Sequence, residues 1–296
     1  MDDPARGRTL TTRDLRTVPN ATKVEPSPIP DGLDATLVLV RHGESTFIAE
    51  GRFQGRADSP LTAIGRRQAV LVAERLAAPR AAPILPVPAG PPRELVHSPL
   101  GRTTETAVAI ETAMRTAGWA ISCRPDDGFP EIDQGAWQGL HRDEIGARYG
   151  AELATWRRTP LAGWAPGGES LPEVQARVGP SLAAMLATLG DGRPPGTLDR
   201  SHVAGYGEPP AAHPWSIVVG HDGVFRIALL TLFGLSLERY WMWSMDLCAI
   251  TIVEVRAGRP VLRAHNLTAH LGALDEETSA TARMAAALER ERSGAQ

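Results

Sequence analysis

Short apolar runs along the chain alternate with segments in which apolar residues recur at helical spacing. The run over about 35–40 leads into Arg41-His-Gly43, and the run over 215–220 leads into His221-Asp-Gly223. Continuous apolar runs of this length are typical of strands that are buried on both faces of a parallel sheet. Further strands are expected over 94–97, 119–124, 249–255 and 261–265.

Helical periodicity fills the segments between these strands. Residues 62–77 place Ile64, Leu71 and Leu76 at near-helical spacing, with Thr62 as the N-cap. Other helices are expected over about 101–117, 171–189 and 223–234. The short turn between the last two strands indicates an antiparallel edge. The alternation predicts a three-layer α/β/α sandwich with a mostly parallel central sheet.

Segments of different composition flank or interrupt this domain, which we expect to span 35–273. Residues 1–34 are rich in Thr, Arg, Pro and Asp without an apolar period, which predicts a disordered leader. Residues 130–170 combine short helical pieces, glycines and three tryptophans, which favours a small cap insertion over a site. The Gly- and Pro-rich stretch 190–213 predicts a flexible insertion, and 274–296 a helical tail.

Composition excludes several classes of function. The net charge of −3 argues against nucleic acid as a partner, and no apolar stretch is long enough to span a bilayer. Lys23 is the only lysine, so 30 of the 31 basic residues are arginine, and lysine-dependent phosphate loops and Schiff bases are excluded from the domain. Two cysteines and an N-terminus without an apolar signal segment favour a cytoplasmic protein.

Cationic and imidazole side chains follow three of the expected strands. Arg41 and His42 follow the first strand, Arg102 lies on the first turn of the helix after 94–97, and His221 follows the strand over 215–220. The carboxyl ends of parallel strands meet at one sheet edge, so these four side chains should converge. They would repel one another unless an anion lay between them, and helix N-termini add backbone donors. A dianionic phosphoryl group fits this arrangement better than a carboxylate, because it has more oxygens to accept hydrogen bonds.

The same residues lie in motifs that resemble those of the histidine phosphatase superfamily, also called the phosphoglycerate mutase-like family. The motifs occur in family order and span about 36–266. They are Arg41-His-Gly-Glu-Ser45, Arg52-Phe-Gln-Gly55, Asp58-Ser-Pro-Leu-Thr62, Ser98-Pro-Leu-Gly-Arg-Thr-Thr-Glu-Thr-Ala107, Pro130-Glu-Ile-Asp-Gln-Gly-Ala-Trp-Gln-Gly139, Gly167-Gly-Glu-Ser170 and Val218-Val-Gly-His-Asp-Gly223.

This resemblance implies a mechanism. His42 would be the nucleophile and form a phosphohistidine, while Arg41, Arg102 and His221 would hold the phosphoryl oxygens. Glu131 would act as general acid and then as general base, with Asp222 as a less favoured proton donor. No metal or other cofactor is required by such a mechanism. The residues expected to contact the substrate are Arg41, Ser45, Arg52, Gln54, Gly55, Arg102, His221 and Asp222, with Glu169, Phe53, Trp137, Trp156 and Trp164 as further candidates.

One position departs from the family pattern. Many members carry an asparagine six residues after the nucleophilic histidine, where this chain has Ile48. The departure leaves the fold unaffected but removes one expected phosphate contact. The first hypothesis is a phosphomonoesterase that acts on a small phosphorylated metabolite. A cofactor-dependent phosphoglycerate mutase and a non-catalytic phospho-ligand-binding protein are the alternatives, and the sequence leaves a homodimer open.

Overall fold

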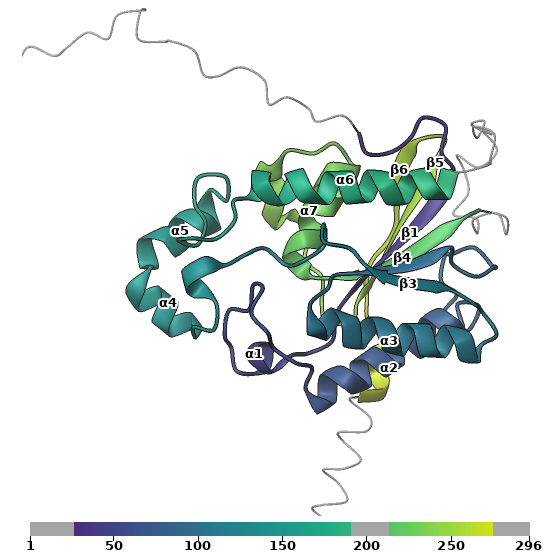
Figure 1. Cartoon of the computed structure of the whole chain (residues 1–296), viewed down its shortest axis with the longest axis horizontal. Coiled ribbons are helices and arrows are strands. Elements are labelled where there is room, and N and C mark those ends of the chain that lie inside the picture. Colours follow the sequence, from purple (N-terminus) through teal and green to yellow (C-terminus); the bar gives the residue numbers. More distant parts are fainter. Residues whose placement is uncertain (1–26, 191–212, 275–296) are drawn as a thin grey trace, which may run out of the picture.

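A computed structural model describes residues 27–190 and 213–274 (Figure 1). Within these residues a six-stranded sheet has the order β3-β2-β4-β1-β5-β6. Its strands are β1 (Ala35–Arg41), β2 (Glu94–His97), β3 (Ser122–Pro125), β4 (Trp215–Gly220), β5 (Ile250–Arg256) and β6 (Arg259–Leu267). β1, β2, β3 and β4 are parallel, whereas β5 is antiparallel to β1 and β6 is antiparallel to β5. The predicted mostly parallel sheet with an antiparallel edge is confirmed.

The strand register places the candidate residues at one edge of this sheet. Arg41 is paired with Gly220 across β1 and β4, and His97 is paired with Val219 across β2 and β4. The residues that follow these strand ends are therefore brought together, although they lie far apart in the chain. This is the convergence that parallel strands impose at their carboxyl ends.

Helices cover both faces of the sheet (Figure 1). α2 (Ala63–Ala77) and α3 (Gly101–Thr116) lie on one face, and α6 (Leu171–Gly190) and α7 (Asp222–Leu232) lie on the other. Alternate residues of β1 enter the two cores, with Leu37 and Leu39 on the α6–α7 side and Val38 and Val40 on the α2–α3 side. A shift of the β1 register by one residue would exchange these two faces. The free energy gained by burying each apolar side chain, about 1.5–3 kcal/mol, therefore fixes the register.

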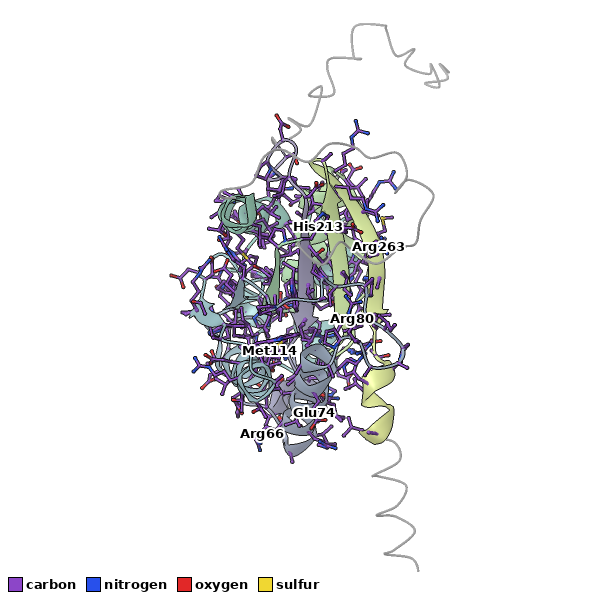
Figure 2. All side chains as sticks on the ribbon, turned by 90° about the vertical axis from the view of Figure 1, so that its right-hand side faces the viewer. Arg66, Glu74, Arg80, Met114, His213 and Arg263 are labelled. Carbon is purple, nitrogen blue, oxygen red and sulfur yellow. The ribbon has the colours of Figure 1, made fainter. Side chains whose placement is uncertain are left out.

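The side-chain view shows the same layering from the side (Figure 2). Met114 on α3 is fully buried between the helix and the sheet, whereas Arg66 and Glu74 on α2 are exposed. None of the helices in the described part of the chain is long and apolar enough to cross a membrane.

The cap lies beyond the end of the sheet layers (Figure 1). It comprises η1 (Gly135–Trp137), α4 (Arg142–Arg148) and α5 (Gly150–Arg158). α4 begins with a capping box, in which the His141 side chain accepts from Asp143 N and the Glu144 carboxylate accepts from His141 N. The cap has a small core of its own, made of Trp137, Ile145, Leu153 and Ala165. The remaining short elements are α1 (Thr46–Ala49), η3 (Leu237–Met242) and η4 (Ala269–Leu271).

The structure differs from the sequence-based expectation at several element boundaries. Ile29 and Leu33, within the expected leader, are buried in the core beside α6, so residues 27–34 are packed rather than disordered. The first strand residue of β3 is Ser122 rather than residue 119, and Trp119 instead packs its ring against Trp215. Residues 1–26, 191–212 and 275–296, which contain the rest of the expected leader, insertion and tail, lie outside the described residues.

Candidate active site

His42 lies just beyond the end of β1 and is 1% exposed. Its Nδ1 is 2.6 Å from the carbonyl oxygen of Gly43. A carbonyl only accepts hydrogen bonds, so Nδ1 carries the ring proton and Nε2 keeps its lone pair. The ring meets that of His221 at an interplanar angle of 65°, with 5.0 Å between centroids. The local fold thus holds a neutral imidazole with one fixed tautomer.

His221 precedes α7 and is fully buried. Its Nε2 lies 2.9 Å from the hydroxyl oxygen of Ser98, and its Nδ1 has no hydrogen-bond partner among the described residues. Burial, the charge of Arg102 and the neighbouring groups His42 and Arg41 hold the pKa of His221 well below 6.5. Burial and the charges of Arg102 and Arg41 do the same to the pKa of His42. Both rings are therefore neutral near pH 7.

Two arginines bring positive charge to these histidines. Arg102 is 1% exposed, and it donates to the carbonyl oxygens of Ala57 at 3.1 Å and Gly55 at 2.7 Å. Burial lowers its pKa to about 10, so it stays charged at neutral pH. Arg41 donates from Nη1 to the carbonyl oxygen of Met245 at 2.5 Å. The buried Nε atoms of both arginines have no partner among the described residues, an arrangement that an anion would complete.

Glu131 is held at the start of α7. Its Oε1 accepts from the backbone N–H groups of Ile132 at 2.9 Å and Val224 at 3.1 Å, and its Oε2 accepts from Gly223 at 3.3 Å. A Cβ atom on Gly223 would lie 2.6 Å from Glu131 Oε1, so this close approach requires glycine. Desolvation raises the pKa of the Glu131 carboxyl above 4.5 in spite of these hydrogen bonds. A carboxyl with a raised pKa can both donate and accept a proton near neutral pH.

An ion-pair network holds the main chain at Glu131. Arg177 on α6 donates to the carbonyl oxygens of Pro130 at 2.9 Å and Glu131 at 3.2 Å. Its Nε and Nη2 each lie 3.0 Å from the Glu169 carboxylate. Arg56 donates from Nη2 to Glu169 at 2.6 Å and from Nε to the Glu131 carbonyl at 3.2 Å. Glu169, expected to contact substrate, is instead ion-paired within the protein.

A cleft of about 450 Å³ opens above these residues towards the cap. Its lining residues are Arg41, Ile48, Gly51, Arg52, Phe53, Gln54, Gly55, Glu131, Gln134, Arg142, Trp156, Arg157, Asp222 and Trp241. His42 and His221 are the chain neighbours of Arg41 and Asp222, and Arg102 is hydrogen-bonded to Gly55, so the three buried residues adjoin the lining of the cleft. Ile48, the departure from the family pattern, faces the cleft.

Most of the expected contact residues lie at this cleft. Arg52, Gln54, Gly55 and Asp222 line it, but Ser45 is buried and donates from Oγ to Oε1 of Gln54. The structure therefore places Ser45 behind Gln54 rather than on the cleft surface.

The charged lining residues Arg52 and Asp222 are already engaged. The guanidinium of Arg52 donates to Glu50 at 2.9 Å and to the carbonyl oxygen of Gly139 at 2.8 Å. Asp222 accepts from Arg226 at 2.7 Å and from the N–H of Met245 at 3.0 Å. Both side chains are thus held in place by protein contacts.

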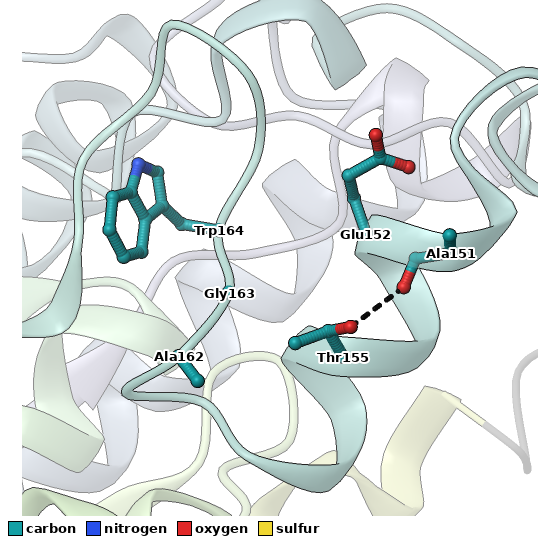
Figure 3. A pocket seen from close by; sticks show the side chains of 6 residues that line it. All are labelled: Ala151, Glu152, Thr155, Ala162, Gly163 and Trp164. Carbon is teal, nitrogen blue, oxygen red and sulfur yellow. Dashed lines mark hydrogen bonds between the residues drawn. The ribbon is translucent and has the colours of Figure 1, made fainter.

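The aromatic candidates separate into three environments. Phe53 and Trp156 line the cleft, whereas Trp137 is 1% exposed and belongs to the core of the cap. Trp164 lines a different cavity of about 330 Å³ beside α5 (Figure 3). In that cavity the hydroxyl of Thr155 donates to the carbonyl oxygen of Ala151 at 2.9 Å. None of the residues expected to bind the phosphoryl group lines the cavity at Trp164.

Three residues that hold the candidate catalytic residues in place were not identified from the sequence, namely Ser98, Arg56 and Arg177. Ser98 lies within one of the recognised motifs, and this position was the available signal for its contact with His221. Arg56 and Arg177 gave no such signal, because a single arginine on a loop or an amphipathic helix is usually a solvated surface charge.

Comparisons with known proteins agree with this geometry. The family model of the histidine phosphatase superfamily (branch 1) matches residues 37–268. Phosphoserine phosphatase 1 of Hydrogenobacter thermophilus is 28% identical over 239 residues, which cover 80% of this chain and 94% of that protein. The probable phosphoglycerate mutase GpmB of Citrobacter koseri is 38% identical over 160 residues, which cover 53% of this chain and 65% of that protein.

The likeness extends to solved structures. The native structure of a mycobacterial glucosyl-3-phosphoglycerate phosphatase is 27% identical with a TM-score of 0.62, and the match covers 79% of this chain and all of that one (100%). The matched family model spans β1 to β6 and includes both histidine motifs. The chain therefore belongs to the histidine phosphatase superfamily, branch 1.

Proposed function

We propose that this protein is a metal-independent phosphomonoesterase that hydrolyses a small phosphorylated metabolite through a phosphohistidine on His42. The observation that carries the proposal is the state of the His42 ring. Its Nδ1–H is bound by the Gly43 carbonyl, and burial and two arginines hold its pKa well below 6.5, so Nε2 is a free nucleophile at neutral pH.

In the first step, His42 Nε2 attacks phosphorus in line with the leaving group. The new N–P bond forms as the P–O bond to the substrate alcohol breaks, and Glu131 donates a proton to the departing oxygen. Arg41, Arg102 and His221 hold the remaining phosphoryl oxygens, and their fixed donors stabilise the charge that spreads over them. The arginines supply the positive charge that a metal ion supplies in other phosphoryl-transfer sites.

In the second step, water attacks the phosphorus of the phosphohistidine. Glu131, now a carboxylate, accepts a proton from the water as the N–P bond breaks. Phosphate leaves, and neutral His42 and protonated Glu131 are restored. The raised pKa of Glu131 supports this double role, because burial makes the carboxyl hold its proton more firmly than an exposed glutamate does.

The relatives support hydrolysis of a phosphomonoester. The phosphoserine phosphatase and the glucosyl-3-phosphoglycerate phosphatase carry hydrolase names, whereas GpmB is named as a probable mutase. A mutase would return the phosphoryl group to the product instead of passing it to water. The two reactions differ in whether free phosphate or an isomeric phosphomonoester accumulates.

A rapid-quench experiment with a phosphomonoester labelled in its phosphoryl group tests the proposal. We expect protein-bound label that survives alkali and is lost in acid, as a phosphohistidine requires, followed by release of free phosphate. His42→Ala should abolish both, while His270→Gln, a histidine outside the cleft lining, should retain them. Full turnover by His42→Ala would disprove the nucleophile assignment, and isomerised product without phosphate release would favour the mutase.

A further inference from the structure

Two arginines line the cap end of the cleft without balancing charges. Arg142 is the first residue of α4, Arg157 lies near the end of α5, and both side chains are exposed at the cleft. Over 27–190 and 213–274, neither guanidinium has a hydrogen bond or ion pair. Arg52 differs, because Glu50 and Glu144 lie 2.9 Å and 3.7 Å from its guanidinium.

The acidic side chains of the cleft do not offset this charge. Among the lining residues, only Glu131 and Asp222 carry carboxyl groups. Glu131 is bound by backbone N–H groups at the start of α7, and Asp222 is ion-paired with Arg226 at 2.7 Å. The cap end therefore carries an excess of positive charge, and a cleft with one sign of charge attracts ligands of the opposite sign.

The cleft is also large enough for more than a phosphoryl group. Its volume of about 450 Å³ lies within the range of about 300–1,000 Å³ that is usual for whole small-molecule ligands. Trp156 and Trp241 form part of its wall and meet edge to face, with 4.5 Å between centroids. Trp241 is 40% exposed despite its size, so part of the apolar wall of the cleft is accessible to a ligand.

From these observations, and resting on the proposed phosphatase activity, we propose that the substrate carries a second anionic group bound by Arg142 and Arg157. The phosphoryl group to be removed lies at His42, the carbon body lies against Trp156 and Trp241, and the second anion lies at the cap. The planar guanidinium group can form two parallel hydrogen bonds with either a carboxylate or a second phosphoryl group. The substrate class is thus a phosphorylated carboxylic acid or a bisphosphate.

Matched substrate pairs test this proposal. O-phosphoserine and phosphoethanolamine differ only in a carboxylate, and a hexose bisphosphate and its monophosphate differ only in a phosphoryl group. We expect the member with the second anion to have a kcat/KM at least about tenfold higher in one of the two pairs, mainly through a lower KM, because the added interaction is present in the ground state. The pair that shows the difference identifies the second anion.

Charge-removing variants connect this preference to the two arginines. Arg142→Gln and Arg157→Gln, singly and together, should lower kcat/KM for the member with the second anion far more than for its partner in the same pair, so that the preference is lost. Arg158→Gln is the matched control, because it removes the same charge from the neighbouring exposed position of α5, outside the cleft lining. The proposal would be overturned if the kcat/KM values of the wild type differed by less than about twofold within both pairs. It would also be overturned if Arg158→Gln lost the preference for the second anion as fully as the two cleft variants.

A binding measurement separates this inference from the phosphatase activity. Calorimetry on His42→Ala protein with the same four compounds needs no turnover. We expect the compound with two anions to bind at least about tenfold tighter, and the difference to disappear when Arg142 and Arg157 are also replaced. If His42→Ala shows this difference in binding but the wild type releases no phosphate, the proposed phosphatase activity is wrong and the second-anion site stands. Equal binding within both pairs would refute the second-anion site, whatever the turnover.

Discussion

The hydroxyl of Ser98 lies 2.9 Å from His221 Nε2 and holds the orientation of that ring. The backbone N–H of Leu100 donates to Ser98 Oγ at 3.4 Å, which holds the hydroxyl in turn. His221 Nδ1, the other ring nitrogen, has no hydrogen-bond partner among the described residues. A phosphoryl oxygen would supply a partner for Nδ1, which makes Ser98 a positioning residue for His221.

Replacing Ser98 with alanine should weaken phosphate binding without unfolding the protein. Loss of one hydrogen bond that orients a buried ring costs about 0.5–1.5 kcal/mol, so we expect kcat/KM for p-nitrophenyl phosphate to fall about two- to tenfold. The inhibition constant of inorganic phosphate should rise by a similar factor. Thr112→Ala, which removes an exposed hydroxyl of α3, serves as the control. An unchanged phosphate inhibition constant in Ser98→Ala would show that Ser98 has no part in positioning.

Much of the site could be predicted from local sequence, because strand ends fix it. Arg41, His42 and His221 directly follow or end apolar runs, and the pairing of Arg41 with Gly220 converts this sequence position into proximity. Glu131 follows no such run, and its assignment depended on a family motif. Its hydrogen bonds to residues 223 and 224 depend on how the chain segment packs on α7, which no local pattern encodes.

The remaining features depend on tertiary contacts between segments far apart in the chain. Glu169 and Arg177 lie eight residues apart, but their role comes from Arg56, more than one hundred residues earlier. Trp156 and Trp164 were both candidates for the cleft, yet one lines the cleft and the other a separate cavity beside α5. The environment of a charge or an aromatic ring is decided by its neighbours in space, which is why the expectations for Glu169 and Trp164 were wrong while that for Trp156 was confirmed.

Stability should fall in acid because of the two buried histidines. The pKa values of His42 and His221 are held well below 6.5 in the folded state. Below about pH 6.5 the two histidines bind protons in the unfolded chain but stay neutral in the folded chain. The free energy of unfolding therefore decreases as the pH falls. Above about pH 6.5 the two histidines do not change the free energy of unfolding. Denaturant unfolding between about pH 5 and about pH 8 measures this dependence.

The same experiment contains its own control. His42→Gln removes one of the two titrating rings, so the acid-side slope should be smaller than in wild type. Vanadate or phosphate at saturation should also reduce the slope, because an anion between the arginines raises the folded-state pKa values towards that of the unfolded chain. An identical slope in wild type and His42→Gln would exclude His42 as a source of the acid dependence.

Glu131→Gln should affect substrates according to their leaving group. A glutamine cannot donate a proton to an alkoxide, so turnover of an alkyl phosphate should fall by about 10²–10⁴-fold. Phosphoenzyme formation from p-nitrophenyl phosphate should fall far less, because p-nitrophenolate leaves without protonation. Rapid-quench measurement of the first turnover isolates this step from the hydrolysis that follows. Asp222→Asn tests Asp222 as the alternative proton donor. If the difference between alkyl phosphate and p-nitrophenyl phosphate is larger in Asp222→Asn than in Glu131→Gln, Asp222 rather than Glu131 is the general acid.

Arg177→Met should both destabilise the fold and misplace Glu131. The variant removes the bonds from Arg177 to Pro130 and Glu131 and leaves Arg56 as the only cation bound to the Glu169 carboxylate in the described part of the chain, beside the backbone N–H of Asp133. We therefore expect a loss of about 3 kcal/mol in the free energy of unfolding. The exposed pair of Arg115 with Glu111 provides the control, since Arg115→Met should cost less than about 1 kcal/mol. At a temperature where the variant is folded, turnover of alkyl phosphates should fall more than first-turnover reaction with p-nitrophenyl phosphate. Equal loss with both substrates would mean that Arg177 supports the fold alone and does not position the proton donor.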